Sequence, residues 1–158
     1  MKRIQFLLIL VLISIIDANA QSDNFTTNSS SYKNAIGLKI FPGAITFKHF
    51  FTPKKAAELV SYFRSSGVRI TALYETHGSI AIIPGLRWYV GPGAHVSLYS
   101  KSYGGTGSVG IDGVIGLDYK VHSIPLNLSL DWQPSFDFKS IDGLIGNWFL
   151  IAFRYTLN

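Results

Sequence analysis

The residues of this chain that are best suited to form a catalytic pair are His95 and Ser97. A serine hydroxyl becomes a nucleophile when a histidine removes its proton, and such a pair supports acyl transfer. Residues two positions apart share one face when their segment is a β-strand. Whether this pair can act depends on which side of its strand it occupies.

The other reactive side chains do not form a recognisable site. The chain has no cysteine, which excludes disulfides, thiolate metal sites and thiol catalysis. His49 and His77 fall near the ends of predicted strands, His122 falls in a predicted turn, and none has a carboxylate at metal-ligand spacing. The glycine-rich run 104–107 lacks the Lys-Ser/Thr pair and the helix of a phosphate-binding loop. We therefore expect no metal and no cofactor.

The composition indicates one domain with an unusually apolar surface. The chain has 158 residues, of which 47% are hydrophobic and 15% are charged, compared with roughly 25% charged in an average soluble domain. These values exclude intrinsic disorder and argue against a soluble helical protein, because the outer faces of its helices would need more Lys and Glu. The net charge is +5, but no basic run is longer than Lys54-Lys55, so nucleic-acid binding is not expected.

The N-terminal segment has the pattern of a secretory signal peptide. Lys2 and Arg3 precede an apolar stretch from Ile4 to Ile16, and Ala18-Asn19-Ala20 has the small-x-small form that signal peptidase cleaves. The apolar stretch is too short to span a bilayer. We expect residues 1–20 to be removed, residues 21–33 to form a flexible polar lead-in, and residues 34–158 to form one β-barrel domain.

Apolar and polar residues alternate with a period of two through most of the remaining chain. In the segment from Leu126 to Asp137, Leu128, Leu130 and Trp132 fall on one side, and the Asn, Ser and Asp residues between them fall on the other. The same pattern, interrupted by Gly, Pro and Ser turn signals, predicts eight strands. They are Ala35–Ile40, Ala44–Phe51, Ala56–Arg64, Val68–His77, Leu86–Ser100, Gly110–Lys120, Leu126–Asp137 and Phe149–Leu157.

Eight is an even number of strands, as a single-chain outer-membrane barrel requires. Strands of about ten residues leave about six residues for each connection, which suits hairpins between sequential neighbours. The predicted fold is an all-β, eight-stranded antiparallel up-and-down transmembrane β-barrel. The segment Ala56–Arg64 has two interpretations, a strand or a helical turn, because it begins with Ala-Ala-Glu-Leu-Val.

The charged residues indicate which face of the sheet is outside. If the apolar face contacts lipid, ten charged side chains point into the lumen: Lys39, Lys48, Glu58, Arg69, Glu75, Arg87, Asp112, Asp118, Asp131 and Arg154. The bore of an eight-stranded barrel is just wide enough to be filled by side chains, so we expect a plug of ion pairs and hydrogen bonds. Arg64 and Lys120 belong to the same polar faces and are expected inside as well.

Aromatic residues toward the strand ends are expected to form the girdles that mark the two membrane interfaces. This set contains Trp88, Tyr89, Tyr119, Trp132, Trp148 and Tyr155. The inverse arrangement is a soluble lipocalin-like barrel with an apolar pocket. It would place Trp132, Phe149 and Phe153 in the same narrow bore and leave a sparsely charged surface in water.

Several segments resemble the small eight-stranded β-barrel proteins of Gram-negative outer membranes. The resemblance rests on the leader that ends at Ala20, on Trp88–His95, Gly110–Tyr119 and Pro125–Trp132, and on the closing Arg154–Leu157. It implies an outer-membrane location, contact with outer-membrane lipid and, during biogenesis, with the barrel-assembly machinery.

The His-x-Ser pair is also similar to that of the outer-membrane lipid A deacylases, which carry it on a barrel strand. In this chain the alternation turns His95 and Ser97 toward the lumen, where an acyl chain held in the membrane cannot reach them. We therefore predict no catalytic residue.

We expect a non-enzymatic, monomeric outer-membrane barrel with a structural or adhesive role that is exercised through its outward loops. With both termini in the periplasm, Lys101–Thr106 and Lys139–Gly146 are the long outward loops. The alternatives are a lipid A-modifying enzyme of the same fold, a soluble periplasmic lipocalin-like carrier of an apolar ligand, and a narrow pore. The sequence names no extracellular ligand.

Overall fold

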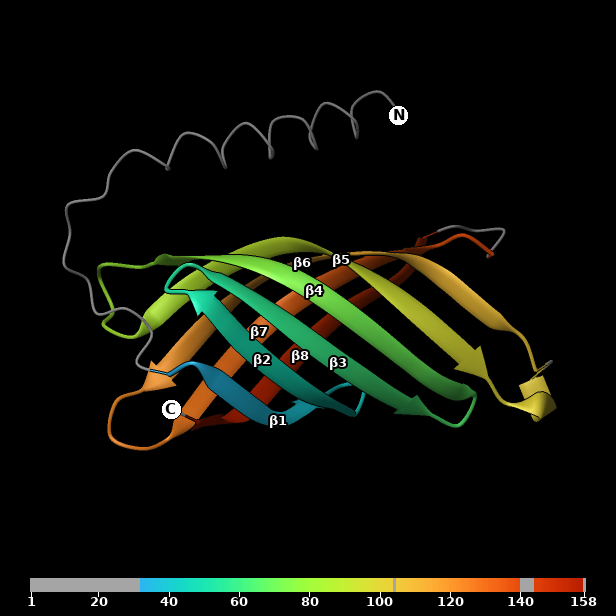
Figure 1. The fold of residues 1–158 in the computed structure, drawn as a ribbon, viewed down its shortest axis with the longest axis horizontal. Coiled ribbons are helices and arrows are strands. Elements are labelled where there is room, and N and C mark those ends of the chain that lie inside the picture. The colour runs from blue at the N-terminus through green and yellow to red at the C-terminus, as the bar shows by residue number, and fades with distance from the viewer. Residues whose placement is uncertain (1–31, 104, 140–143, 158) are drawn as a thin grey trace, which may run out of the picture.

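Eight strands form a closed barrel in the computed structural model, which describes residues 32–103, 105–139 and 144–157 (Figure 1). Each strand pairs antiparallel with the next, and β8 closes the barrel against β1. The prediction of an all-β, eight-stranded antiparallel barrel is confirmed. The strands are β1 (Asn34–Ile40), β2 (Ala44–Thr52), β3 (Lys55–Arg64), β4 (Gly67–Ser79), β5 (Leu86–Tyr99), β6 (Gly107–Val121), β7 (Leu126–Asp137) and β8 (Leu144–Leu157), and a 3-10 turn, η1 (Lys101–Tyr103), precedes β6.

The strands differ from the predicted ones mainly at their ends. Ala56–Arg64 lies within β3, so the helical-turn interpretation is wrong. β8 begins at Leu144, which makes the predicted loop Lys139–Gly146 shorter than expected. The predicted signal peptide (1–20) and residues 21–31 of the predicted lead-in lie outside the described residues. No helix in the described part of the chain is long and apolar enough to cross a membrane.

The up-and-down path distributes the connections between two ends of the barrel. The hairpins after β1, β3, β5 and β7 lie at one end, here called the loop end, at the right of Figure 1. The start of β1, the end of β8 and the hairpins after β2, β4 and β6 lie at the other, here called the terminal end. The loops that were predicted to face outward therefore share the loop end.

Alternate residues of one strand occupy two different environments. On β7, Ser129 and Asp131 are 4% and 1% exposed, whereas Leu130 between them is 50% exposed. On β1, Lys39 is buried between the exposed Leu38 and Ile40. Because successive side chains of a strand point to opposite faces, the polar residues line the interior and the apolar residues line the outer surface.

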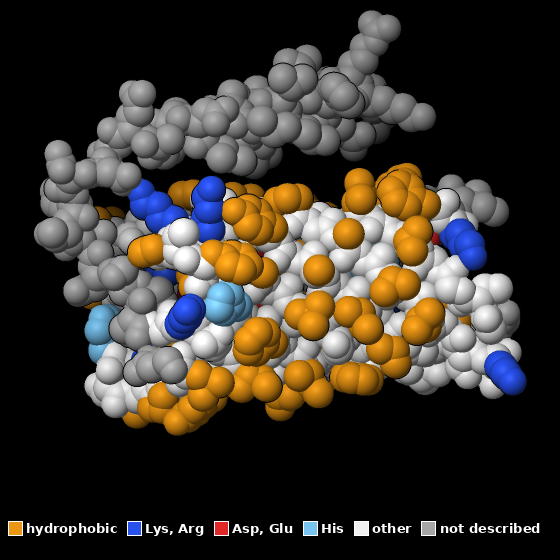
Figure 2. Space-filling view, in the orientation of Figure 1, with side chains coloured by type: hydrophobic (Ala, Val, Ile, Leu, Met, Phe, Trp, Pro, Cys, Tyr) orange, Lys and Arg blue, Asp and Glu red, His pale blue; other side chains and the backbone are white. Residues whose placement is uncertain are grey.

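The outer surface between the two ends is a belt of exposed apolar side chains (Figure 2). All eight strands contribute to it, for example through Leu38, Phe47, Leu59, Ile70, Val96, Ile115, Leu130 and Phe153. The described charged side chains that are exposed lie only at strand ends and in hairpins: Lys33, Lys54, Lys55, Arg64, Lys101 and Lys139. The belt itself therefore shows no exposed charge among the described residues.

Aromatic side chains lie at both ends of the belt, but they are not all the predicted ones. The exposed rings at the loop end are Phe41, Phe63, Tyr99 and Phe138. The rings on the outer surface at the terminal end are Phe51, Trp88, Tyr119 and Tyr155, of which Trp88 and Tyr119 are half-buried. The assignment of Tyr89 to a girdle is wrong, because it follows Trp88 directly and therefore points into the lumen, fully buried. Trp132 faces outward but lies mid-strand on β7, and the side chain of Trp148 is outside the described set.

Candidate functional site: the charged lumen

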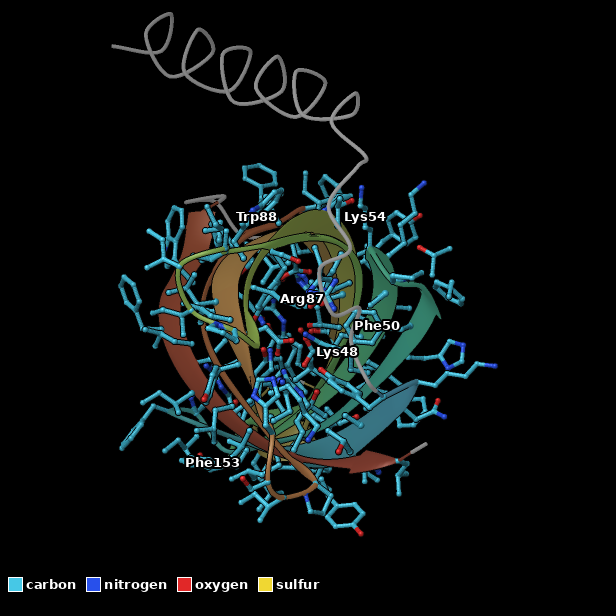
Figure 3. The ribbon with its side chains drawn as sticks, turned by 90° about the vertical axis from the view of Figure 1, so that its left-hand side faces the viewer. Lys48, Phe50, Lys54, Arg87, Trp88 and Phe153 are labelled. Atoms are coloured by element: carbon cyan, nitrogen blue, oxygen red, sulfur yellow. The ribbon has the colours of Figure 1, made fainter. Side chains whose placement is uncertain are left out.

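The structure places all ten charged residues of the predicted lumen network inside the barrel. Nine of them are at most 7% exposed, and the side chain of Arg69 is 11% exposed. Figure 3 looks into the barrel from the terminal end, where Lys48 and Arg87 project into the bore and Phe153 points away from it. Each strand contributes at least one member: Lys39 (β1), Lys48 (β2), Glu58 (β3), Arg69 and Glu75 (β4), Arg87 (β5), Asp112 and Asp118 (β6), Asp131 (β7) and Arg154 (β8).

Two further charges that were expected inside lie at the ends of the barrel. Arg64 is the last residue of β3 and is exposed at the loop end. Lys120 is half-buried at the terminal end, and its amine donates to the carbonyls of Val121 and Ile124 at 2.7 and 2.8 Å. Both side chains were expected in the lumen, but each lies where its strand ends. The Arg64 side chain therefore reaches solvent, and the Lys120 amine reaches the carbonyls of the following turn.

Glu58 on β3 is the carboxylate on which most cations converge. Its Oε1 accepts hydrogen bonds from Arg154 and from Thr46 and lies 3.2 Å from the Lys39 Nζ. Its Oε2 lies 3.7 Å from the Lys48 Nζ. The cations come from β8, β1 and β2, so one carboxylate joins four neighbouring strands. We call Glu58, Lys39, Lys48 and Arg154 the Glu58 cluster.

Asp131 on β7 continues the network across the bore. The Lys39 Nζ lies 3.1 Å from its Oδ2, and the Tyr89 hydroxyl donates to the same oxygen at 2.6 Å. The amide of Gln133 donates to Oδ1 at 2.9 Å, and Tyr62 in turn donates to the Gln133 carbonyl oxygen at 2.6 Å. Lys39 therefore bridges the carboxylates of β3 and β7, two strands that lie on opposite walls of the barrel.

Lys48 extends the Glu58 cluster toward β4 and β5. Its Nζ lies 2.8 Å from the Glu75 Oε2 and 4.3 Å above the centre of the Tyr89 ring. The His77 Nε2 lies 2.8 Å from the same Glu75 oxygen, and its imidazole stacks on Tyr89 with ring centroids 5.1 Å apart. Desolvated cations gain from contact with an aromatic face, so Tyr89 stabilises Lys48 as well as donating to Asp131 on β7.

Tyr32 closes the terminal end of the lumen. It is 4% exposed, it contacts Phe50 edge to face, and its hydroxyl donates to Asp118 at 3.2 Å, where the Asn127 amide also donates at 2.7 Å. Burial, and then the charge of Asp118, raise the pKa of the Tyr32 hydroxyl well above its usual value, so it remains a donor. The expectation of a flexible lead-in through Lys33 is therefore wrong for Tyr32.

A second ionic group lies toward the loop end. The Arg69 guanidinium donates to Asp112, and the His95 Nδ1 lies 2.8 Å from the other Asp112 oxygen. The His95 Nε2 lies 3.6 Å from Asp137, which accepts a 2.6 Å hydrogen bond from Ser108. Above this group a cavity of about 50 Å³ opens between the β3–β4 hairpin and β5.

The His95 and Ser97 pair lies on the lumen side of β5. Both residues are buried, and the imidazole is oriented by Asp112. Their strand neighbours Val96 and Leu98 are exposed on the outer surface, so the pair is separated from the apolar belt by the barrel wall. Within the described ranges, no group of three or more His, Asp and Glu side chains is arranged to hold a metal ion.

Two glycines on β6 make room for large lumen side chains of β5. Gly116 pairs with Tyr89, and a Cβ on it would lie 2.7 Å from the Tyr89 Cζ. Gly110 pairs with His95, and a Cβ there would meet the imidazole and the Phe136 carbonyl oxygen. Real Cβ atoms do not approach neighbours that closely, so both positions require glycine for the lumen to keep its packing.

The sequence placed some neutral residues on the inner face but did not identify them as hydrogen-bonding partners of the charged network. Asn127 and Gln133 have the same parity on β7 as Asp131, so the alternation contained this signal. Tyr62 and Tyr89 were harder to place, because tyrosine suits both a girdle and a hydrogen-bonded interior. His77 falls near the end of β4, and Tyr32 precedes the first strand altogether.

The lumen charges nearly cancel. The described interior holds five basic side chains, Lys39, Lys48, Arg69, Arg87 and Arg154, and six carboxylates, Glu58, Glu75, Asp112, Asp118, Asp131 and Asp137. A buried charge without a partner costs several kcal/mol, roughly, so this balance is what allows so many ions in a narrow bore. The side chains fill the lumen and bind one another, which makes the interior a plug.

Comparisons with protein-family models, with curated proteins and with solved structures found no match to this chain. What the barrel does is therefore argued from its own geometry.

Proposed function

We propose that this chain is a monomeric, non-enzymatic outer-membrane protein that crosses the bilayer with its eight strands. The residues at its loop end face outward and exercise a structural or adhesive role, and the lumen is closed. Outer-membrane lipid surrounds the belt, and the barrel-assembly machinery is the expected partner during biogenesis.

One observation carries this proposal: the polarity of the molecule is inverted relative to a soluble protein. Charged residues such as Lys39, Glu58 and Arg154 are at most 1% exposed, whereas apolar residues of the same strands, such as Leu38 and Leu59, are 59% and 49% exposed. In water the exposed belt would favour aggregation. In a bilayer it meets hydrocarbon, and closure of the barrel satisfies every strand edge.

The filled lumen supports a closed barrel over the alternatives. A carrier of an apolar ligand needs an apolar cavity, but the bore contains the Glu58 cluster and the Asp131 bonds. A pore would need these bridges across the bore to separate. A lipid-modifying enzyme would need its nucleophile on the belt, and Ser97 is buried on the opposite side of the wall.

Cell fractionation with a heat-modifiability gel tests the proposal. Expressed from its full sequence in a Gram-negative host, the protein should be recovered in the outer-membrane fraction with its N-terminus at Gln21. Its unheated form should migrate faster than the heated form, because a folded barrel resists detergent. Recovery in the soluble periplasmic fraction would contradict the proposal.

The closed lumen is tested separately by conductance. The purified barrel, inserted into a planar bilayer, should show no steady ion current. A stable current that requires the folded protein would show that the plug opens and would favour the pore.

A further inference from the structure

β8 is longer than the strand that closes the barrel against it. β8 has 14 residues and β1 has 7, and β1 pairs with β8 only from Ile151 to Leu157. The other half of β8, Leu144–Leu150, lies beside β7, and no described strand pairs with it on the β1 side. In Figure 1 the β1–β2 hairpin accordingly stops short of the other hairpins at the loop end. We call Leu144–Leu150 the open edge.

The register shows which backbone groups of β8 face the open side. The Thr156 amide donates to the Pro125 carbonyl, so even-numbered residues along the continuous register direct their N–H and C=O groups toward β7. Odd-numbered residues direct theirs away from β7, and Ile151 thereby meets Ile40 of β1. The next odd-numbered residue is Phe149, and no described backbone group bonds to it on that side. Its N–H and C=O are therefore available to another strand.

The open edge lacks the features by which proteins protect an unpaired strand. Such edges are usually kept short, or they carry charged residues or proline that prevent pairing with another chain. The segment has the sequence Leu-Ile-Gly-Asn-Trp-Phe-Leu, which contains no charge and no proline. Isoleucine, tryptophan and phenylalanine are also residues that favour strands. The sequence of the open edge thus favours pairing with an added strand.

The open edge belongs outside the hydrocarbon of the bilayer. Unpaired backbone groups are too costly in hydrocarbon, so in the proposed insertion this part of β8 lies at or beyond the outer boundary. The exposed rings beside it agree, because Phe41 and Phe149 are 75% and 67% exposed and aromatic rings favour that boundary. A chain that arrives from outside therefore reaches the open edge without entering the bilayer.

We propose that the open edge binds an extended, uncharged segment of another protein, which adds to the barrel as a strand alongside β8. This proposal rests on the proposed outward orientation of the loop end, and it names the kind of partner that the adhesive role requires. Hydrogen bonds to the backbone of Phe149 and Asn147 supply affinity, and side chains at alternate positions supply specificity. A β-branched residue opposite Phe149 makes the cross-strand contact that aromatic residues favour.

A second copy of the chain fits the open edge less well than a separate peptide does. Copies inserted in one membrane have the same orientation, so β8 runs from the loop end toward the terminal end in each of them. Two such edges cannot pair antiparallel, which is the more stable arrangement of strands. A separate extended segment has no such constraint and can run antiparallel to β8.

Binding of a designed strand peptide tests the proposal. The probe is a fluorescein-labelled heptapeptide of alternating threonine and valine with a lysine added at each end for solubility. When it is added to the purified barrel in neutral detergent micelles, its fluorescence anisotropy should rise to saturation. A control peptide has proline in place of each valine, which removes N–H donors of the strand. It should bind at least about tenfold more weakly.

Two substitutions at one position connect the binding to the backbone of β8. Phe149→Pro removes the N–H that faces the open side and keeps the bonds to β7, because those bonds come from even-numbered residues. This variant should bind the probe at least about tenfold more weakly. The matched control Phe149→Val keeps the N–H and favours a strand, so its affinity should stay within about threefold of the unaltered protein.

Amide hydrogen exchange gives a measurement that needs no variant. Without the probe, the amide of Phe149 should exchange rapidly and that of Leu150, which faces β7, should exchange slowly. The probe should slow exchange at Phe149 and Asn147 and leave Leu150 unchanged. Because this experiment uses the unaltered protein, it decides the question even if Phe149→Pro does not fold.

Three results would overturn the proposal. They are no binding of the probe, equal binding of the control peptide, and protection of the Phe149 amide before the probe is added. Dimers of the unaltered protein that Phe149→Pro abolishes would assign the edge to a second copy and would overturn it as well. None of these results changes where the protein is found on fractionation, so they leave the proposed outer-membrane location intact.

Discussion

The inner and outer surfaces of β7 meet opposite environments, a polar interior on one side and an apolar belt on the other. Ser129 and Asp131 lie in the bore among named partners, whereas Leu130 lies on the belt and needs only an apolar solvent. Each lumen position therefore requires a particular side chain that matches its partners, whereas a belt position requires only an apolar side chain. We therefore expect a substitution in the lumen to lower the free energy of unfolding because it breaks an ion pair or a hydrogen bond. A substitution on the belt should lower the free energy of unfolding when it places a polar or charged group in hydrocarbon.

The largest expected effect is at the centre of the lumen. Glu58→Gln leaves Lys39, Lys48 and Arg154 without their shared carboxylate, so the free energy of unfolding should fall by about 3–5 kcal/mol in a urea series in lipid vesicles. The matched control is Asp137→Asn, because the hydrogen bonds to Asp137 come from the Ser108 hydroxyl and the Lys139 backbone amide, both neutral groups. Equal losses in the two variants would show that the Glu58 cluster has no special role.

The belt should respond to polarity and tolerate changes in shape. Leu130→Arg places a charge on the outer surface in the middle of β7, which should cost about 2–4 kcal/mol in a bilayer. Leu130→Phe, its control, should change stability little because the site has no fixed partner to displace. If the arginine variant is as stable as the phenylalanine variant in vesicles, position 130 does not contact hydrocarbon.

A double-mutant cycle sharpens the comparison within the lumen. Lys39 and Asp131 are 3.1 Å apart, and both are fully buried. Lys39→Met and Asp131→Leu should each destabilise the barrel, and the double variant should recover about 0.5–3 kcal/mol of the summed loss, because neither charge is then left alone. Additive losses would mean that the two side chains do not interact in the folded protein.

The smallest predicted effect concerns the terminal end. Tyr32→Phe removes one hydrogen bond to Asp118 but keeps the ring on Phe50, so the expected loss is about 1 kcal/mol. Lys33→Gln, the exposed neighbour, should stay within about 0.5 kcal/mol of the unaltered protein. If Tyr32→Phe is as silent as Lys33→Gln, Tyr32 is not part of the plug.

The sequence allowed the strands and their inner faces to be predicted, because both follow from a period of two. The charge of Glu58, for example, already excluded its side chain from the lipid-facing side. Its partners could not be predicted, because Lys39 and Arg154 reach it only through the register of β1 with β2 and β8 and through closure of the barrel. Local alternation contains no information on that register.

Two further residues show where pattern reasoning failed. Tyr89 was assigned to a girdle by its type, although its parity relative to Trp88 places it inside. Tyr32 lies in a polar stretch without a period, so only the tertiary structure shows that it bonds to Asp118 on β6. The prediction for Tyr89 was wrong because it relied on residue type instead of position in the strand. The contact of Tyr32 could not be predicted because Asp118 lies far from it along the chain.

The central claim is that the belt contacts hydrocarbon, and a single label at position 130 tests it most directly. The chain contains no cysteine, so Leu130→Cys can be labelled with bimane as the sole thiol, with Ser123→Cys in the β6–β7 hairpin as the exposed control. In vesicles, bilayer-resident nitroxide lipids should quench the label at 130 and aqueous iodide should not, with the reverse at 123. Quenching at 130 by iodide, without quenching by the nitroxide lipids, would contradict the account.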